Sequence, residues 1–169
     1  KEEAASSNVV DAPAKGLKPW RQVILPHDDV AAGRFNVAEF AADLELVRTR
    51  DPQTAPEYRD PVPFFERTYL TNGLRDLLRD GLRRIAGLGG QPVYNCQTNF
   101  GGGKTHSLIA LYHLFSGVQA GDLPPEARAL VEAEVSEIPA VRRAVVVGNR
   151  FGAGDVHTEP AGTEIYTLW

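Results

Sequence analysis

Several stretches of the chain carry apolar residues at the three- and four-residue spacing of an amphipathic helix. They cover residues 37–49, 74–85 and 105–115. The first follows Asn36, which forms a typical N-terminal capping pair with Glu39. A glycine-rich segment at residues 87–90 is expected to end the second, and Pro124-Pro125 is expected to open a further short helix through Glu134. The hydrophobic pattern therefore predicts a chain rich in helices.

Two shorter apolar runs lack helical spacing and predict strands. The first covers residues 92–97, and the second is the β-branched run at residues 144–147, which is typical of a buried parallel strand. Residues 17–35 predict an ordered loop or an edge strand that ends in a turn. Residues 51–63 are broken by prolines, so we expect a stiff, extended connector there.

A glycine loop lies between the first predicted strand and the helix at residues 105–115. It reads Thr98-Asn99-Phe100-Gly101-Gly102-Gly103-Lys104-Thr105. Successive glycines let the backbone turn its N–H groups inward, and a lysine and a hydroxyl follow in the order that holds nucleotide phosphates. Thr98 stands where the usual P-loop pattern has its first glycine. The order of strand, loop and helix favours a P-loop over the alternative, a glycine-rich turn before an ordinary core helix.

Each residue of this loop has an expected role in binding ATP and Mg²⁺. The N–H groups that would hold the β-phosphate belong to Gly101, Gly102, Gly103, Lys104 and Thr105. The Lys104 ammonium would bridge the β- and γ-phosphates, and the Thr105 hydroxyl would ligate Mg²⁺. His106 could approach the α-phosphate through its backbone N–H, while its side chain could equally pack. Tyr69 and Leu70 are candidates for an adenine pocket, with core packing an equal alternative.

These elements predict an α/β fold. We expect a partial P-loop NTPase core of parallel strands and flanking helices, preceded by a mostly helical and loop-rich N-terminal region. Residues 1–16 would be a flexible lead-in, residues 17–90 the N-terminal region packing on the nucleotide core, and residues 91–169 the first part of the P-loop domain. The strand at residues 144–147 ends in Gly148-Asn149 rather than in the acidic residue that P-loop enzymes use for Mg²⁺ and water. The sequence therefore identifies no catalytic residue.

Composition narrows the class of protein without changing this interpretation. The 169 residues are 43% hydrophobic and 24% charged, which is ordinary for a globular domain. A net charge of -4 does not suggest binding to nucleic acid or to a membrane surface, which an excess of positive charge would favour. Arg75, Arg79 and Arg83 share one helix face, where a solvated, salt-bridged surface is favoured over contact with phosphate or a partner. A single cysteine and the lack of any apolar stretch of about 20 residues predict a cytoplasmic protein.

Separated motifs also carry a family resemblance. They are Pro26-His27-Asp28-Asp29-Val30, Ala38-Glu39-Phe40-Ala41-Ala42-Asp43-Leu44, Pro63-Phe64-Phe65 with Thr68-Tyr69-Leu70-Thr71, and Phe100-Gly101-Gly102-Gly103-Lys104-Thr105-His106. Together they resemble the start of the large prokaryotic ATPases known as the domain of unknown function 499 family, from about Leu17 to Trp169. The last motif is much rarer than a generic P-loop. This family also has a non-glycine residue at the place of Thr98.

The resemblance implies an AAA-like P-loop ATPase module found in phage-defence gene neighbourhoods, beside DNA methyltransferase-like and helicase or nuclease proteins. It implies no substrate. We therefore expect the ATP-binding module of a larger ATPase in a phage-defence or DNA-processing system. The alternative is a nucleotide-sensing regulatory or scaffold module without hydrolysis. A small-molecule kinase is disfavoured, because kinases of this length hold the whole site in one chain.

Overall fold

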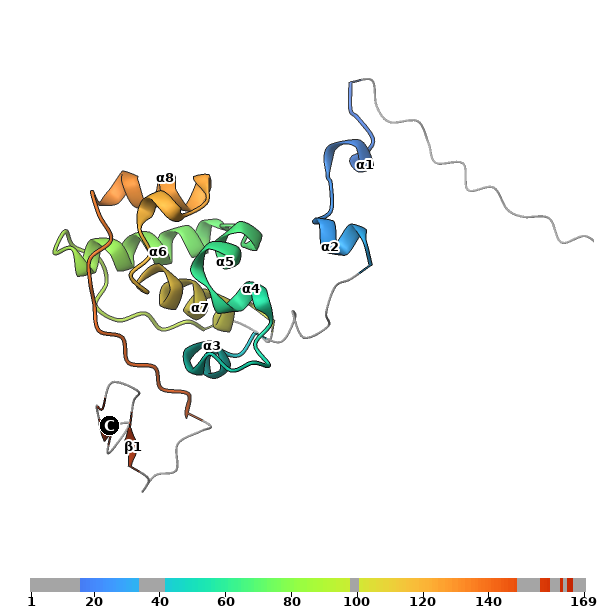
Figure 1. The fold of residues 1–169 in the computed structure, drawn as a ribbon. Helices are drawn as coiled ribbons and strands as arrows, with labels where there is room; N and C mark the ends of the chain where they lie inside the picture. The colour runs from blue at the N-terminus through green and yellow to red at the C-terminus, as the bar shows by residue number, and fades with distance from the viewer. Residues whose placement is uncertain are drawn as a thin grey trace, which may run out of the picture. The chain divides into compact units, whose positions relative to one another are not determined.

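The computed structural model describes residues 16–33, 42–97, 101–148, 156–158, 162 and 164–165. The chain divides into two compact units, coloured along the sequence in Figure 1. The first unit, as far as it is described, contains two single-turn helices, α1 (Trp20–Val23) and α2 (Asp28–Ala31). The prediction of an ordered loop or an edge strand at residues 17–35 is therefore wrong, because the described part of this segment contains two short helices.

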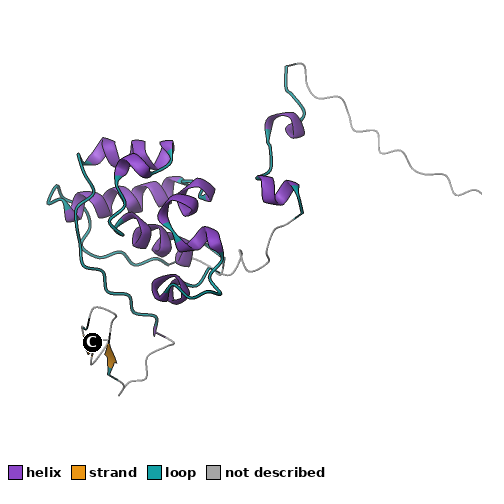
Figure 2. Cartoon of the chain, viewed as in Figure 1, coloured by secondary structure: helices purple, strands orange, loops and turns teal. Residues whose placement is uncertain are grey.

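The second unit is built mainly from helices (Figure 2). They are α3 (Leu44–Thr49), α4 (Pro56–Arg59), α5 (Pro61–Arg67), α6 (Asn72–Ile85), α7 (Lys104–Leu114), the 3₁₀ helix η2 (Ala120–Asp122) and α8 (Pro125–Glu134). The helices α6 and α7 confirm the predictions from hydrophobic spacing, and α8 confirms the helix predicted after Pro124-Pro125. Of the helix expected at residues 37–49, the structure shows only the last part as α3, because Ala42 and Asp43 are not helical. The Asp43 carboxylate caps the N-terminus of α3 at 2.8 Å from the Glu45 nitrogen. The proposed capping pair of Asn36 and Glu39 lies outside the described residues.

One hydrophobic core joins these helices. Helix α7 packs against α3, α5 and α6, and α6 also packs against α8. The most deeply buried apolar side chains come from α6, α7, α8 and the residue after η2: Leu78, Leu82, Ile109, Leu114, Leu123 and Val131. Burying each of these side chains stabilises the fold by roughly 1.5–3 kcal/mol. None of the described helices is long and apolar enough to cross a bilayer.

The proline-rich segment at residues 51–63 is not the extended connector that we expected. It contains α4 and the start of α5, and both helices have proline in their first turn, Pro56 in α4 and Pro61 in α5. Proline is well tolerated there because the first N–H groups of a helix have no partner within the helix, and its fixed φ suits the helix. Proline would break a helix in its interior, but here Pro56 and Pro61 each begin a short helix.

The predicted α/β fold with a parallel P-loop core is wrong. Neither residues 92–97 nor residues 144–147 pair as strands; both run as extended chain in the structure. The only strands in the described residues are β1 (His157–Thr158) and β2 (Glu164–Ile165), which pair antiparallel. Apolar, β-branched sequence suits a pleated surface, but it does not supply the neighbouring strand that a parallel ladder needs. Val93 is 78% exposed and Val146 45% exposed, so these runs are not buried as strands would be.

Contacts with α6 fix the chain that follows this helix. The Tyr94 hydroxyl donates to the Asp80 carboxylate. Desolvation and this hydrogen bond raise the pKa of Tyr94 to about 12. Gly90 lies so close to α6 that a Cβ there would be 2.6 Å from the Asp80 carbonyl oxygen. The segment predicted as a strand is thus attached to a helix instead of a sheet.

Gly89 and Gly90 form a matched pair for testing this contact. Both have positive φ, 103° and 96°, so alanine at either position carries backbone strain of about 1–2 kcal/mol. Only Gly90→Ala also drives a Cβ into the α6 backbone. We expect Gly90→Ala to lower the free energy of unfolding by about 1–3 kcal/mol more than Gly89→Ala, measured by urea denaturation. Equal losses in the two variants would show that the chain does not pack on α6 at this point.

Candidate functional site

The glycine loop leads directly into helix α7. Gly101 has φ 81° and Gly103 has φ 74°, and Gly103 is the N-terminal cap residue of the helix that Lys104 begins. A Cβ added at either glycine would meet no atom within 4 Å. Glycine is therefore needed here for its left-handed backbone and not for lack of space.

The first turn of α7 has backbone N–H groups that a ligand could use. They have no partner within the helix, and the cap residue Gly103 has no side chain to accept from them. The first intrahelical bond runs from the Ser107 nitrogen to the Gly103 oxygen, at 2.9 Å. Lys104 is half-buried and Thr105 is exposed. A glycine turn, a row of N–H groups, an ammonium and a hydroxyl therefore occupy one end of one helix. Thr98, where the usual motif has its first glycine, lies outside the described residues.

The His106 side chain packs into the protein. Its ring centroid lies 4.8 Å from that of Phe64 and 6.0 Å from that of Tyr58. The Thr68 hydroxyl donates to the Phe64 carbonyl oxygen at 2.7 Å, so it accepts from His106 Nε2–H at 3.2 Å. Burial lowers the pKa of His106, which favours the neutral ring. The structure therefore shows that the His106 side chain packs against the protein. The backbone N–H of His106 lies in the first turn of α7.

Sequence reasoning missed a second histidine on the same face. His113, two turns along α7, is 2% exposed, and its Nε2–H donates to the Tyr58 carbonyl oxygen at 2.9 Å. Its ring lies 5.1 Å from that of Phe64. The seven-residue spacing of His106 and His113, with Ile109 and Ala110 between them, is the signal that could have placed both on the buried face. The apolar spacing at residues 105–115 also includes Leu108, but this residue is 44% exposed.

The two candidates for the adenine pocket are placed differently. Thr68 contacts His106, so the residues that follow Thr68 lie close to the first turn of α7. Tyr69 is 80% exposed there. Leu70 is 3% exposed and belongs to the hydrophobic core, as the packing alternative holds. Only Tyr69 presents a free side-chain surface that a base could contact.

A comparison with protein families matches the DUF499 N-terminal domain to residues 20–147. The chain belongs to the DUF499 family. Searches of curated proteins and of solved structures found no match. The matched range includes the glycine loop, Lys104 and the aromatic contacts around His106. The loop and the helices that support it therefore lie within a single DUF499 domain.

Arg75, Arg79 and Arg83 of this DUF499 chain all form ion pairs, which confirms the predicted salt-bridged surface on that face of α6. Two of these ion pairs connect α6 to α8, Arg75 with Glu126 and Arg83 with Glu134, the latter at 3.1 Å. Arg79 pairs with Asp76 along α6 at 2.7 Å. These side chains lie largely at the surface, where each such pair contributes up to about 1 kcal/mol. Asn149, which stands in place of the acidic second motif, lies outside the described residues.

The two histidines predict how stability depends on pH. Burial lowers the pKa of both His106 and His113 in the folded state. The unfolded chain therefore binds more protons near its ordinary histidine pKa, so unfolding becomes easier as pH falls through that range. We expect the melting temperature to decrease between about pH 7.5 and about pH 5.5, and the His106→Gln/His113→Gln variant to show a flatter profile. Equal slopes for the two proteins would contradict this account.

Proposed function

We propose that this chain binds ATP through Gly101–Thr105 at the N-terminal end of α7, as the nucleotide-binding module of a larger AAA-like ATPase. The observation that carries the proposal is the geometry at that helix end. Gly101 and Gly103 have the positive φ of a loop that curls its N–H groups around an anion, and Lys104 follows at once. The proposal rests on this P-loop segment and its helix alone, without a parallel sheet.

The groups present match the parts of a nucleotide tail. N–H groups from Gly101 to Thr105 would hold the β-phosphate, aided by the positive end of the α7 dipole. Lys104 would bridge the β- and γ-phosphates. The exposed Thr105 hydroxyl would complete the shell of a Mg²⁺ that arrives with the nucleotide. His106 would add its backbone N–H near the α-phosphate, because its side chain is held by Thr68 and Phe64.

The wider role follows from the family resemblance. It implies work in a phage-defence or DNA-processing system in the cytoplasm, beside methyltransferase-like and helicase or nuclease subunits. The coupled work is a property of the larger protein, because phosphoryl transfer needs an acidic residue and an arginine placed around the γ-phosphate. The phosphate cradle proposed here supplies the binding step.

Lys104→Ala tests the phosphate cradle. Losing a charge-assisted contact to the phosphates should weaken ATP binding by about tenfold to a hundredfold, measured by calorimetry with Mg²⁺ present. Lys18→Ala is the matched control, since Lys18 lies in the other unit and is exposed. We expect wild-type affinity from Lys18→Ala and an unchanged melting temperature from both. Unchanged ATP affinity in Lys104→Ala would exclude this site.

Phosphate release separates the ATPase from the regulatory alternative. Steady release by a longer chain of the same family, lost on the equivalent of Lys104→Ala, supports the ATPase. Tight binding of ATP without turnover in both the longer chain and this one would favour a nucleotide-sensing or scaffold module.

Tyr69 is the proposed contact for the base. Its ring is exposed next to the Thr68–His106 contact, so Tyr69→Ala should leave the melting temperature unchanged. Loss of stacking should weaken ATP binding by about fivefold to a hundredfold. If Tyr69 reads the base, Tyr69→Ala must weaken GTP binding by a different factor from ATP binding. GTP is therefore titrated in the same way. Tyr69→Phe keeps the ring and should bind ATP like the wild type. Equal losses of ATP and GTP affinity in Tyr69→Ala would rule out base reading.

A further inference from the structure

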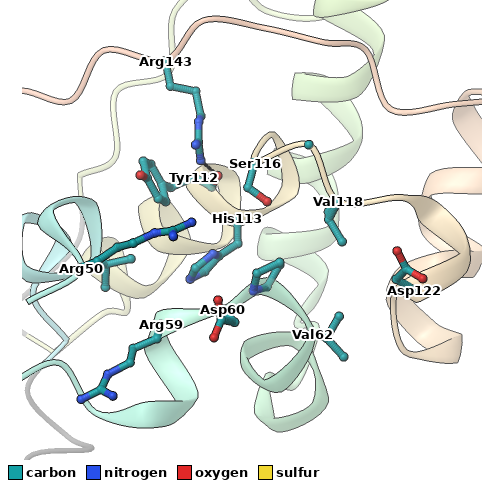
Figure 3. Close-up of a pocket in the computed structure, with 13 residues that line it drawn as sticks. Arg50, Arg59, Asp60, Val62, Tyr112, His113, Ser116, Val118, Asp122 and Arg143 are labelled. Carbon is teal, nitrogen blue, oxygen red and sulfur yellow. Dashed lines mark hydrogen bonds between the residues drawn. The ribbon is translucent and has the colours of Figure 1, made fainter. Parts of the chain in front are cut away.

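A cavity of about 650 Å³ lies at the opposite end of α7 from the glycine loop (Figure 3). Its lining comes from the end of α3, the end of α4 and start of α5, the last turn of α7, the chain from α7 to η2, and the segment that contains Arg143. Small-molecule sites measure roughly 300–1,000 Å³, so this volume is sufficient for a metabolite. The helix rises about 1.5 Å per residue from Lys104 to Leu114, which separates the cavity from the loop by about 15 Å.

Arg143 is held in position at the mouth of this cavity. Its guanidinium carbon lies 3.9 Å from the centre of the Tyr112 ring, and its Nη1 donates to the Tyr112 carbonyl oxygen. These contacts use one face and one edge of the guanidinium. An arginine has five N–H donors, so others remain for a ligand. The side chain is therefore already ordered without a ligand.

Arg50 approaches the same space from the end of α3. Its φ of 52° is left-handed, a conformation that glycine or asparagine usually takes at a helix C-terminus. Figure 3 shows its side chain extending toward His113, on the side of the cavity where Arg143 and Tyr112 lie. No described residue forms a hydrogen bond or ion pair with its guanidinium. Strained backbone that places an unpaired charge at a cavity is typical of binding sites.

The other charges of the lining limit what can bind. Arg59 donates to the carbonyl oxygens of Thr54, at 2.8 Å, and Pro52, so its charge serves the local fold. Asp60 and Asp122 oppose an anion, as does the negative end of the α7 dipole, about half a charge. Asp122 lies far from Arg50 and Arg143 in Figure 3. The arginine side of the cavity is therefore cationic, and the Asp60 side accepts hydrogen bonds.

We infer that this cavity binds a small molecule with an oxyanion group, phosphate or carboxylate, held by Arg50 and Arg143. Guanidinium forks match both groups through paired N–H donors. Asp60 accepts a hydrogen bond from a hydroxyl or amine on the same ligand. The buried His113 ring forms part of the wall, and burial lowers its pKa, which favours the neutral ring. This site is separate from the ATP site proposed above and does not depend on it.

Pyrophosphate and citrate are suitable probes, titrated by calorimetry into the full 169-residue chain carrying Lys104→Ala. That background weakens any binding by the glycine loop, so the cavity can be observed by itself. We expect at least one probe to bind, and Arg50→Gln to weaken it by about tenfold or more, because a charged partner is lost. Amide shifts in the NMR spectrum should concentrate around Arg50, Tyr112 and Ser116.

Arg142→Gln is the matched control. Arg142 neighbours Arg143, is exposed and does not line the cavity. Arg142→Gln removes one positive charge from the chain, as Arg50→Gln does, and should leave the affinity for the probe unchanged. If neither probe binds, or if Arg142→Gln and Arg50→Gln weaken binding equally, the cavity is not an oxyanion site. Pyrophosphate binding without citrate binding would identify phosphate as the preferred group.

Discussion

The packing of Phe64 against helix α7 is the contact on which the rest of the second unit depends. Its ring is 2% exposed and lies within 6 Å of the rings of Tyr58, His106 and His113. Aromatic pairs of this kind contribute roughly 0.5–1.5 kcal/mol beyond their burial. One side chain of α5 thus joins α4 and both ends of the buried face of α7. The half-buried His106 ring and the fully buried His113 ring each have a hydrogen-bond partner there, Thr68 for one and the Tyr58 carbonyl for the other.

The long helices could be predicted from the sequence because their signals are local. Helix α6 has Thr71 at its N-terminus, leucines on one face and glycines after its end, and all of these lie within one short stretch of chain. The starts of α7 and α8 are similarly marked, by Gly103 and by Pro125. The short helices α4 and α5 were missed because proline has opposite meanings inside a helix and in its first turn. Spacing alone does not show which position a proline will take.

The strands were predicted wrongly because strand pairing is not a local property. The run at residues 144–147 has high β-propensity, but a ladder requires a partner at the right distance and register. In the structure the neighbouring Arg143 contacts Tyr112 of α7 instead, and Tyr94 of the other run contacts Asp80 of α6. The glycine turn before α7 was recognised from the sequence, and its role in binding phosphate stays a prediction. The packing of the His106 side chain was one of two alternatives, and the burial of His113 was missed, because histidine is polar and the pattern of apolar residues omits it.

Helix α7 connects the two candidate sites, and its buried face determines how well each can be positioned. Gly103, the cap residue of α7, has no side chain, so the direction of the N–H groups in the first turn is set by the helix itself. That helix is fixed near its start by His106 and near its end by His113, both against the same Phe64. The cavity at the far end includes His113 in its wall. A displacement of α7 by a ligand at either end would therefore have to break imidazole contacts made inside the core, where an unpaired polar group costs about 1–3 kcal/mol. The helix is consequently a stiff support for both sites, and the aromatic cluster that buries it also holds each site in place.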